Sequence, residues 1–199
     1  MSRAVLYVVA GWSGCFVMAL ELLGGRLLAP FFGSSIYVWG AIITVFMLAL
    51  SLGYLAGGRW SLRRPTLRRL GGILIVAAVT SLPVVLFADG WLDALTEHIA
   101  DPRMGSLLGA ILLFLVPTVI SGMVSPYAVR LLVSDMHSSG ASAGRLYFVS
   151  TFGSAVGTLL TSFYLVLYFE VNQILWSMLA ISVATGLAAM LRGSREGKR

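Results

Sequence analysis

The chain has 199 residues, of which 58% are hydrophobic and 11% charged, and its mean hydropathy is +0.92. A soluble domain carries about a quarter charged residues, so this chain has too few polar side chains to cover a surface in water. The formal charge of +6 comes mainly from arginines in short loops, which is typical of membrane topology signals and not of nucleic-acid binding. A single cysteine, Cys15, excludes an internal disulfide, and the distant His98 and His137 argue against a metal site.

Six apolar stretches follow one another along the chain, each long enough to cross about 30 Å of hydrocarbon as a helix. Hydrophobic and polar residues do not alternate within them, which favours helices over a barrel. The first stretch continues past Cys15 and has Trp12 where a lipoprotein cleavage box needs a small residue, so we expect it to be retained. The sequence predicts an all-α, polytopic membrane helix bundle, a single transmembrane domain over residues 1–199. Its helices are expected at about 4–23, 36–58, 70–88, 105–129, 146–169 and 173–191.

The loops differ in charge from one side of the bundle to the other. Positive charge near membrane spans marks the cytoplasmic side, so we expect both termini in the cytoplasm and the chain in a bacterial inner (plasma) membrane. The loop over residues 59–69 is also the candidate surface for docking a partner. Its arginines are Arg59, Arg63, Arg64, Arg68 and Arg69. The opposite loops carry Asp89, Asp93, Glu97, Asp101 and Glu170.

Between the third and fourth stretches, residues 91–99 place Trp91, Leu92, Leu95 and Ile99 on or near one helical face. This pattern predicts a short amphipathic helix lying on the outer membrane surface.

Small residues recur at every fourth position in three of the predicted helices. Such stripes let helix backbones approach closely, and this packing replaces the hydrophobic effect as the force that joins helices in lipid. Three stripes offer more packing surface than one bundle centre needs, which predicts a homodimer or a stable hetero-complex. The stripes are Ala49, Gly53 and Gly57, then Gly153, Gly157 and Thr161, and finally Ala180, Ala184 and Ala188.

A short sequence echo links the two halves of the chain. Gly25-Arg26-Leu27 before Phe32-Gly33-Ser34 recurs as Gly144-Arg145-Leu146 before Phe152-Gly153-Ser154. An inverted repeat of two three-helix units would make the second and fifth helices equivalent, and a chance match is the alternative.

Glu21 is the main candidate for a functional residue, because it interrupts an apolar helix where a carboxylate costs a few kcal/mol unless it is paired or faces water. Arg26 follows five residues later, about 140° away on an ideal helix, beyond the pair Gly24-Gly25. Three interpretations remain open: a polar site that binds a ligand, a structural ion pair, or an interfacial charge without a role.

The fourth stretch contains Pro117 and Pro126, each of which removes a backbone donor, so we expect a kinked or partly unwound helix. Broken helices line substrate cavities in transporters, which adds Ser121 and Ser125 to the candidate ligand-binding residues, although such prolines also occur without a role. The chain has no phosphate loop, metalloprotease motif or nucleophile elbow. We therefore expect no catalytic residue, cofactor or metal, and no enzyme in this chain by itself.

Several of these motifs resemble the membrane region of fused major-facilitator/spermidine synthase-like proteins, and the resemblance covers nearly the whole chain. In that family a Rossmann-like aminopropyltransferase domain usually follows the membrane helices, and no such domain is present in these 199 residues. The position that holds an aspartate in the facilitator loop is occupied by Leu62, which does not fit facilitator-style gating. The matching segments are residues 21–35 (ELLGGRLLAPFFGSS), Val38-Trp39, 51–59 (SLGYLAGGR), Ser125-Pro126 and 144–158.

The resemblance implies a half-facilitator-like scaffold and a link to polyamine chemistry. Three functions then compete. The first is an accessory or anchor subunit that docks a separate aminopropyltransferase-like enzyme or a membrane partner. The second is a small dimeric transporter of a cationic or amphiphilic metabolite such as a polyamine. The third is an enzyme that uses Glu21 on a lipid within the bilayer.

Overall fold

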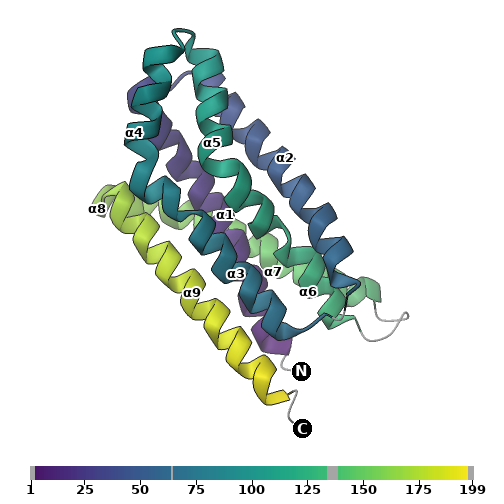
Figure 1. Ribbon diagram of the computed structural model, residues 1–199. Coiled ribbons are helices and arrows are strands. Elements are labelled where there is room, and N and C mark those ends of the chain that lie inside the picture. Colours follow the sequence, from purple (N-terminus) through teal and green to yellow (C-terminus); the bar gives the residue numbers. More distant parts are fainter. Residues whose placement is uncertain (1–2, 64, 134–138, 197–199) are drawn as a thin grey trace.

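The computed structural model describes residues 3–63, 65–133 and 139–196, and every regular element in these ranges is a helix (Figure 1). Six helical segments are long and apolar enough to cross a membrane, as predicted. The first two are α1 (Arg3–Phe32) and α2 (Ile36–Ser61), and the third joins α3 (Leu67–Thr80) to α4 (Leu82–His98). The fourth joins α5 (Pro102–Gly122) to α6 (Val124–Leu132), the fifth comprises α7 (Ser139–Leu160), the π-helical turn η2 (Thr161–Leu165) and α8 (Val166–Tyr168), and the sixth is α9 (Val171–Glu196).

The helix ends differ from the expected ones where local chemistry overrides hydropathy. The first helix continues to Phe32 instead of ending near residue 23, since Glu21 and Arg26 do not break a helix. It ends at Gly33, whose φ of +80° is a left-handed conformation that glycine adopts without strain, and whose N–H donates to the Ala29 carbonyl.

The predicted surface helix over residues 91–99 is wrong as a separate element. Residues 82–98 form one helix, α4, which continues the third span. Leu92 is fully buried and lies against Gly109 of α5, where a Cβ would be only 2.9 Å from the leucine side chain. The apolar face of this segment therefore packs on protein instead of on the membrane surface.

The fourth span breaks at Met123, between α5 and α6. Pro126 explains the position of the break, because its ring displaces the carbonyl of Gly122, four residues earlier. The expected break therefore forms at one place, and Pro117 lies inside the continuous helix α5.

Three pairs of spans make the most extensive contacts: α1 with α7, α2 with α5, and α3 with α9. Their backbones nearly touch at glycines. A Cβ added to Gly153 would lie 2.1 Å from the Gly11 carbonyl oxygen, and one added to Gly71 would lie 2.4 Å from that of Gly186. Two of the three predicted small-residue stripes therefore pack against other helices of the same chain: the stripe of Gly53 and Gly57, and the stripe of Gly153 and Gly157.

The third stripe has a different place in the structure. Ala180, Ala184 and Ala188 are exposed on the outer side of α9, so no helix in the described part of the chain covers them.

These pairings join the first half of the chain to the second. They connect the first span to the fifth, the second to the fourth and the third to the sixth. Exchanging the first span with the fourth, the second with the fifth and the third with the sixth leaves this set of pairs unchanged. Contacts of Gly153 with Gly11 and of Gly157 with Cys15 show that the first pair is parallel, as two odd-numbered spans of a six-span chain must be.

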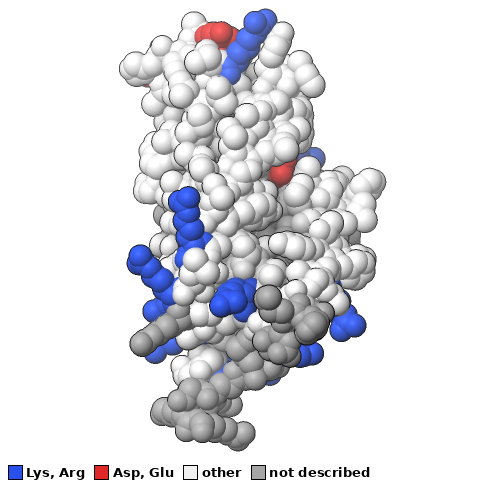
Figure 2. Space-filling model, turned by 90° about the vertical axis from the view of Figure 1, so that its right-hand side faces the viewer, with Lys and Arg blue, Asp and Glu red and all other residues white. Residues whose placement is uncertain are grey.

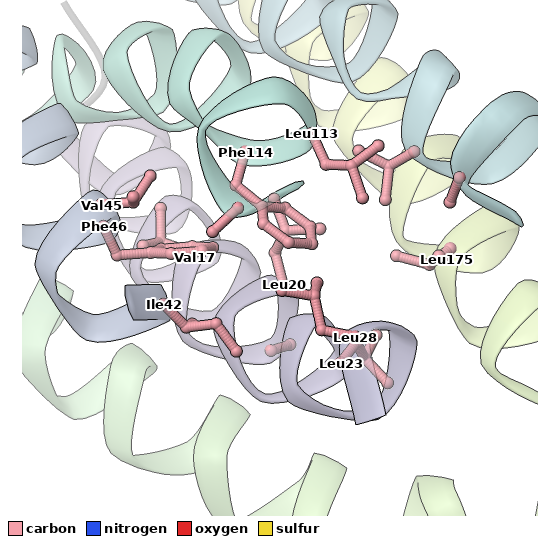
Figure 3. Close-up of a cluster of buried hydrophobic side chains, with 14 of the residues drawn as sticks. Val17, Leu20, Leu23, Leu28, Ile42, Val45, Phe46, Leu113, Phe114 and Leu175 are labelled. Carbon is pink, nitrogen blue, oxygen red and sulfur yellow. The ribbon is translucent and has the colours of Figure 1, made fainter. Parts of the chain in front are cut away.

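Two clusters of buried side chains form the core. One lies among α1, α2, α4, α5 and α9, where Leu20, Ile42, Phe46 and Phe114 are almost fully buried and the two phenylalanine rings are 5.5 Å apart (Figure 3). The other surrounds Tyr127 nearer the chain termini. The fifth span contributes little to either, since only 11% of its most apolar stretch is buried.

Candidate functional site: polar groups in and around the bundle

Glu21 lies half-buried in the part of α1 that crosses the membrane. The 30-residue helix is about 45 Å long, and Glu21 is about 16 Å from its Phe32 end. If α1 is centred on a hydrocarbon layer of about 30 Å, the carboxylate is about 9 Å below the boundary, too deep for its short side chain to reach water. Within the described residues Glu21 has no hydrogen-bond or ion-pair partner.

The direction in which Glu21 projects follows from its neighbours on α1. Glu21 follows Gly14 by seven residues, which is about 20° short of two full turns, so the two residues lie on nearly the same face of α1. Gly14 contacts Ser150 of α7. Glu21 also comes four residues after Val17, which lies beside Phe46 of α2 in Figure 3. Glu21 therefore projects from the strip of α1 between α2 and α7.

Arg26 is exposed and about 9 Å from the end of α1, close to the hydrocarbon boundary, where a long side chain can extend to water. Among the described residues it has no ion-pair partner either, so the structural ion pair with Glu21 does not form within the chain. The interfacial position accounts for the charge of Arg26 in an apolar helix. The charge of Glu21 in the same helix has no such explanation.

Ser121 and Ser125 lie on either side of the break at Met123. The Ser121 hydroxyl donates to the Pro117 carbonyl at 2.8 Å, while the Ser121 carbonyl accepts from Ser13 of α1 at 3.4 Å. The hydroxyl oxygens of Ser125 and of Ser150 on α7 are 3.5 Å apart. These serines form a polar seam where α1, α5, α6 and α7 meet.

The seam and Glu21 are not one site. Ser13 is eight residues before Glu21, which separates the two levels by about 12 Å along α1. The four candidate residues therefore divide into a serine seam that joins helices, an interfacial Arg26 and an isolated carboxylate.

The arginine loop lies at the end of the molecule that also holds both termini (Figure 1), and Figure 2 shows most basic side chains gathered at that end. Thr66 caps α3 by accepting from the Arg69 N–H, and the Thr66 N–H donates to the buried Tyr127 hydroxyl. A groove of about 660 Å³ opens beside Trp60, Arg68 and Arg69. Arg59, Arg63, Arg68 and Arg69 are exposed, and Arg64 lies outside the described residues.

Sequence reasoning missed three polar features. Trp12 donates from Nε1 to the Ser182 hydroxyl at 2.8 Å and so connects α1 to α9. Thr118 and Thr161 are buried, and their hydroxyls have no partner among the described residues. A threonine in an apolar helix usually bonds its own helix, so nothing in the sequence distinguishes these two from the others.

Comparison with known protein families, curated proteins and solved structures gives no match for this chain. Its class rests on the fold alone: six apolar helical spans make it a multi-pass helical membrane protein. In the part of the chain that the structure describes, no three His, Cys, Asp or Glu side chains are grouped as a metal site would need.

Proposed function

We propose that this protein is a membrane subunit of a transport assembly, in which a second copy covers the strip of α1 that carries Glu21. The observation that supports this most strongly is the unpaired, half-buried carboxylate about 16 Å from the end of a 30-residue apolar helix. A carboxylate at that depth is retained where it faces a water-filled path, a cation or a charge on another chain.

The helix arrangement agrees with this proposal. The three closest helix pairs each join the first half of the chain to the second, and many transporters place their substrate sites between two such halves near the bilayer midplane. On either side of Glu21, α2 and α7 expose large apolar side chains, with Met47, Leu52 and Phe152 more than half exposed. A second copy related by a two-fold axis would bring two Glu21 carboxylates into one enclosed space.

Paired carboxylates in an enclosed space select cations. The substrate class is therefore a small cationic or amphiphilic metabolite, and a polyamine is the example that the family resemblance suggests.

Uptake by the purified protein in liposomes tests this function. Radiolabelled spermidine should enter saturably, Glu21→Gln should lower uptake to that of empty liposomes, and Glu170→Gln should leave it unchanged. Glu170 is the matched control because it is an exposed carboxylate at the opposite end of the spans from the arginines. Uptake that Glu21→Gln does not alter, or no uptake above empty liposomes, would contradict the proposal.

Cross-linking tests the assembly separately from transport. In a Cys15→Ser background, Glu21→Cys should form a cross-link between two copies with a short bismaleimide. Leu187→Cys, on the outer side of α9 and 48% exposed, should not. A cross-link at Leu187 with none at Glu21 would place the dimer interface elsewhere.

A second candidate function is docking of a soluble aminopropyltransferase-like enzyme, favoured by the exposed arginines and the groove beside them. Charge reversal at Arg63 and Arg68 should then release an enzyme that copurifies with the native protein. Arg103→Glu, at the other end of the bundle, is the control. Copurification that survives the reversal would exclude docking through these arginines.

A further inference from the structure

The groove beside Arg68 and Arg69 runs from charged side chains into the apolar part of the bundle. Both arginines line it from the first turn of α3, and Gly72 and Val76 line it further along the same helix. Val76 follows Arg68 by eight residues, so the groove extends about 12 Å along α3 from its charged end. Charged groups followed by apolar ones match the order of the phosphate and the acyl chains in a phospholipid.

The apolar part of the groove is open to the lipid around the bundle. Val76 is 48% exposed, and a Cβ added to Gly72 would meet nothing within 4 Å. Ile120 of α5 and Met123 at the α5–α6 break line the groove from neighbouring helices. This part lies beyond the arginines, within the third span, where a chain from the bilayer reaches it and a soluble protein does not.

The charged end of the groove has no counter-charge from the described part of the chain. Arg68 is exposed and has no hydrogen-bond or ion-pair partner among the described residues. The Arg69 guanidinium donates to the Arg63 carbonyl, which joins it to the loop before α3. Along the third span, the first acidic residue after Arg68 is Asp89, 21 residues later and about 30 Å away. The charge at this end is therefore complementary to an anionic group from outside the chain.

Trp60 of α2 marks the level of the charged end in the membrane. It lines the groove, is 41% exposed, and lies edge-on to the ring of Tyr127, with the ring centroids 6.0 Å apart. The Tyr127 hydroxyl accepts from the Thr66 N–H at 3.2 Å, which connects this aromatic pair to the start of α3. Tryptophans at the ends of membrane spans lie at the level of lipid head groups. The arginines of the groove are therefore at the level of lipid phosphates.

We infer that this groove binds an anionic glycerophospholipid from the leaflet at the arginine end, with its phosphate on Arg68 and Arg69 and one acyl chain along α3 past Gly72 to Val76. Basic pockets between membrane-spanning helices recognise anionic lipid head groups. The arginines alone would suit a soluble acidic partner equally well, and the apolar continuation of the groove favours the lipid. This site is separate from Glu21, so its test does not depend on transport.

Native mass spectrometry of the full chain in detergent measures lipid binding directly. The probes are dioleoyl phosphatidylglycerol, which is anionic, and dioleoyl phosphatidylcholine, which has the same acyl chains and a zwitterionic head group. Phosphatidylglycerol should bind saturably, one molecule per chain, and at least about fivefold more tightly than phosphatidylcholine, the effect of one basic residue near an anionic lipid. Glycerol 3-phosphate, which has the charge and no acyl chain, should not displace the lipid.

A matched pair of arginine variants tests the charged end of the groove. Arg68→Gln should weaken binding of phosphatidylglycerol about fivefold, whereas Arg145→Gln should leave it unchanged. Arg145 is also exposed and does not line the groove. It lies level with Arg3 at the same end of the molecule, because each precedes by eight residues a glycine of the Gly11–Gly153 contact.

A matched pair of glycine variants tests the apolar end. Gly72→Leu fills the groove where a Cβ meets nothing, so it should fold and lose one-to-one binding of phosphatidylglycerol. Gly58→Leu, on α2, also places its Cβ in open space, does not line the groove and should bind the lipid as the native chain does. Without lipid, both variants should melt at or above the native temperature, because leucine is a better helix former than glycine.

Equal affinity for the two lipids, or displacement of the lipid by glycerol 3-phosphate, would overturn the inference, and this comparison in the native chain needs no variant. Unchanged binding of phosphatidylglycerol in either Arg68→Gln or Gly72→Leu would also overturn it, because the lipid would then lie elsewhere on the bundle. A soluble protein that copurifies with the native chain and is lost in Arg68→Gln, without a change in lipid binding, would assign the arginines to protein docking instead.

Discussion

Adjacent glycines on α2 provide a direct test of the close packing in this bundle. A Cβ added to Gly57 would lie 2.5 Å from the carbonyl oxygen of Met123 and 2.6 Å from its Cα. At Gly58, one residue later, a Cβ would have nothing within 4 Å. Gly57→Ala and Gly58→Ala therefore make the same chemical change in the same helix, one against a neighbouring backbone and one in open space.

The magnitude follows from this geometry. An ordinary contact needs at least 3.4 Å, so Gly57→Ala is short by about 0.9 Å, and backbone atoms give way only if the helices separate. A gap of that size forfeits about a quarter to a half of the dispersion energy of the contacts it opens. Overpacking of this kind costs about 1–3 kcal/mol, whereas Gly58→Ala should be neutral or stabilise by up to about 1 kcal/mol.

Equilibrium unfolding in mixed detergent micelles, titrated with sodium dodecyl sulfate and followed by circular dichroism, measures both variants. Gly57→Ala should lower the free energy of unfolding by at least about 1 kcal/mol relative to Gly58→Ala. Equal stabilities would show that α2 does not approach the α5–α6 break as closely as described, and the argument for glycine-mediated pairing would fail with it.

Trp12→Phe or Ser182→Ala should each cost about 0.6–1.7 kcal/mol of stability, and the double variant should cost little more than one of them, since both remove one hydrogen bond. Glu21→Gln and Arg26→Gln should be additive within about 0.5 kcal/mol in melting experiments, because the two residues are unpaired; a larger coupling would show that they do pair. The orientation given by the positive-inside rule can be tested with single cysteines in a Cys15→Ser background and an impermeant thiol reagent on intact cells. Cysteines at Thr66, Ser139 and Ser194 should be shielded, and cysteines at Thr96 and Asn172 should be labelled. The opposite labelling pattern would show that the orientation is reversed.

The number of spans was predictable because uninterrupted apolar stretches of about 20 residues have few alternatives in lipid. The packing of residues 91–98 could not be predicted from the sequence. An amphipathic pattern looks the same whether its apolar face meets the membrane surface or another helix, and only the contact of Leu92 with Gly109 decides between them. The small-residue stripes likewise marked surfaces for close packing without naming partners: Gly53 faces α5, and Ala184, in a similar stripe, faces outward.

Glu21 was identifiable from the sequence because a charge in an apolar stretch is conspicuous, whatever the fold. The sequence did not reveal whether Arg26 pairs with it, since that depends on where α1 ends relative to the membrane. Thr161 was not identifiable at all. Its hydroxyl is buried without a partner among the described residues, at the start of a π-helical turn, and neither property has a sequence signature at a single threonine.

The three close helix pairs also have a consequence for biosynthesis. Each pair joins a helix from the first half of the chain to one from the second, so none can close while only the first three spans have entered the membrane. Until the fourth span arrives, the glycine surfaces of α1, α2 and α3 face lipid, and the last pair forms only with α9. The first half of the molecule should therefore be a target for membrane proteases while it is alone. Two halves made as separate chains, divided between His98 and Pro102, should find each other and assemble, because each carries the missing packing surface of the other.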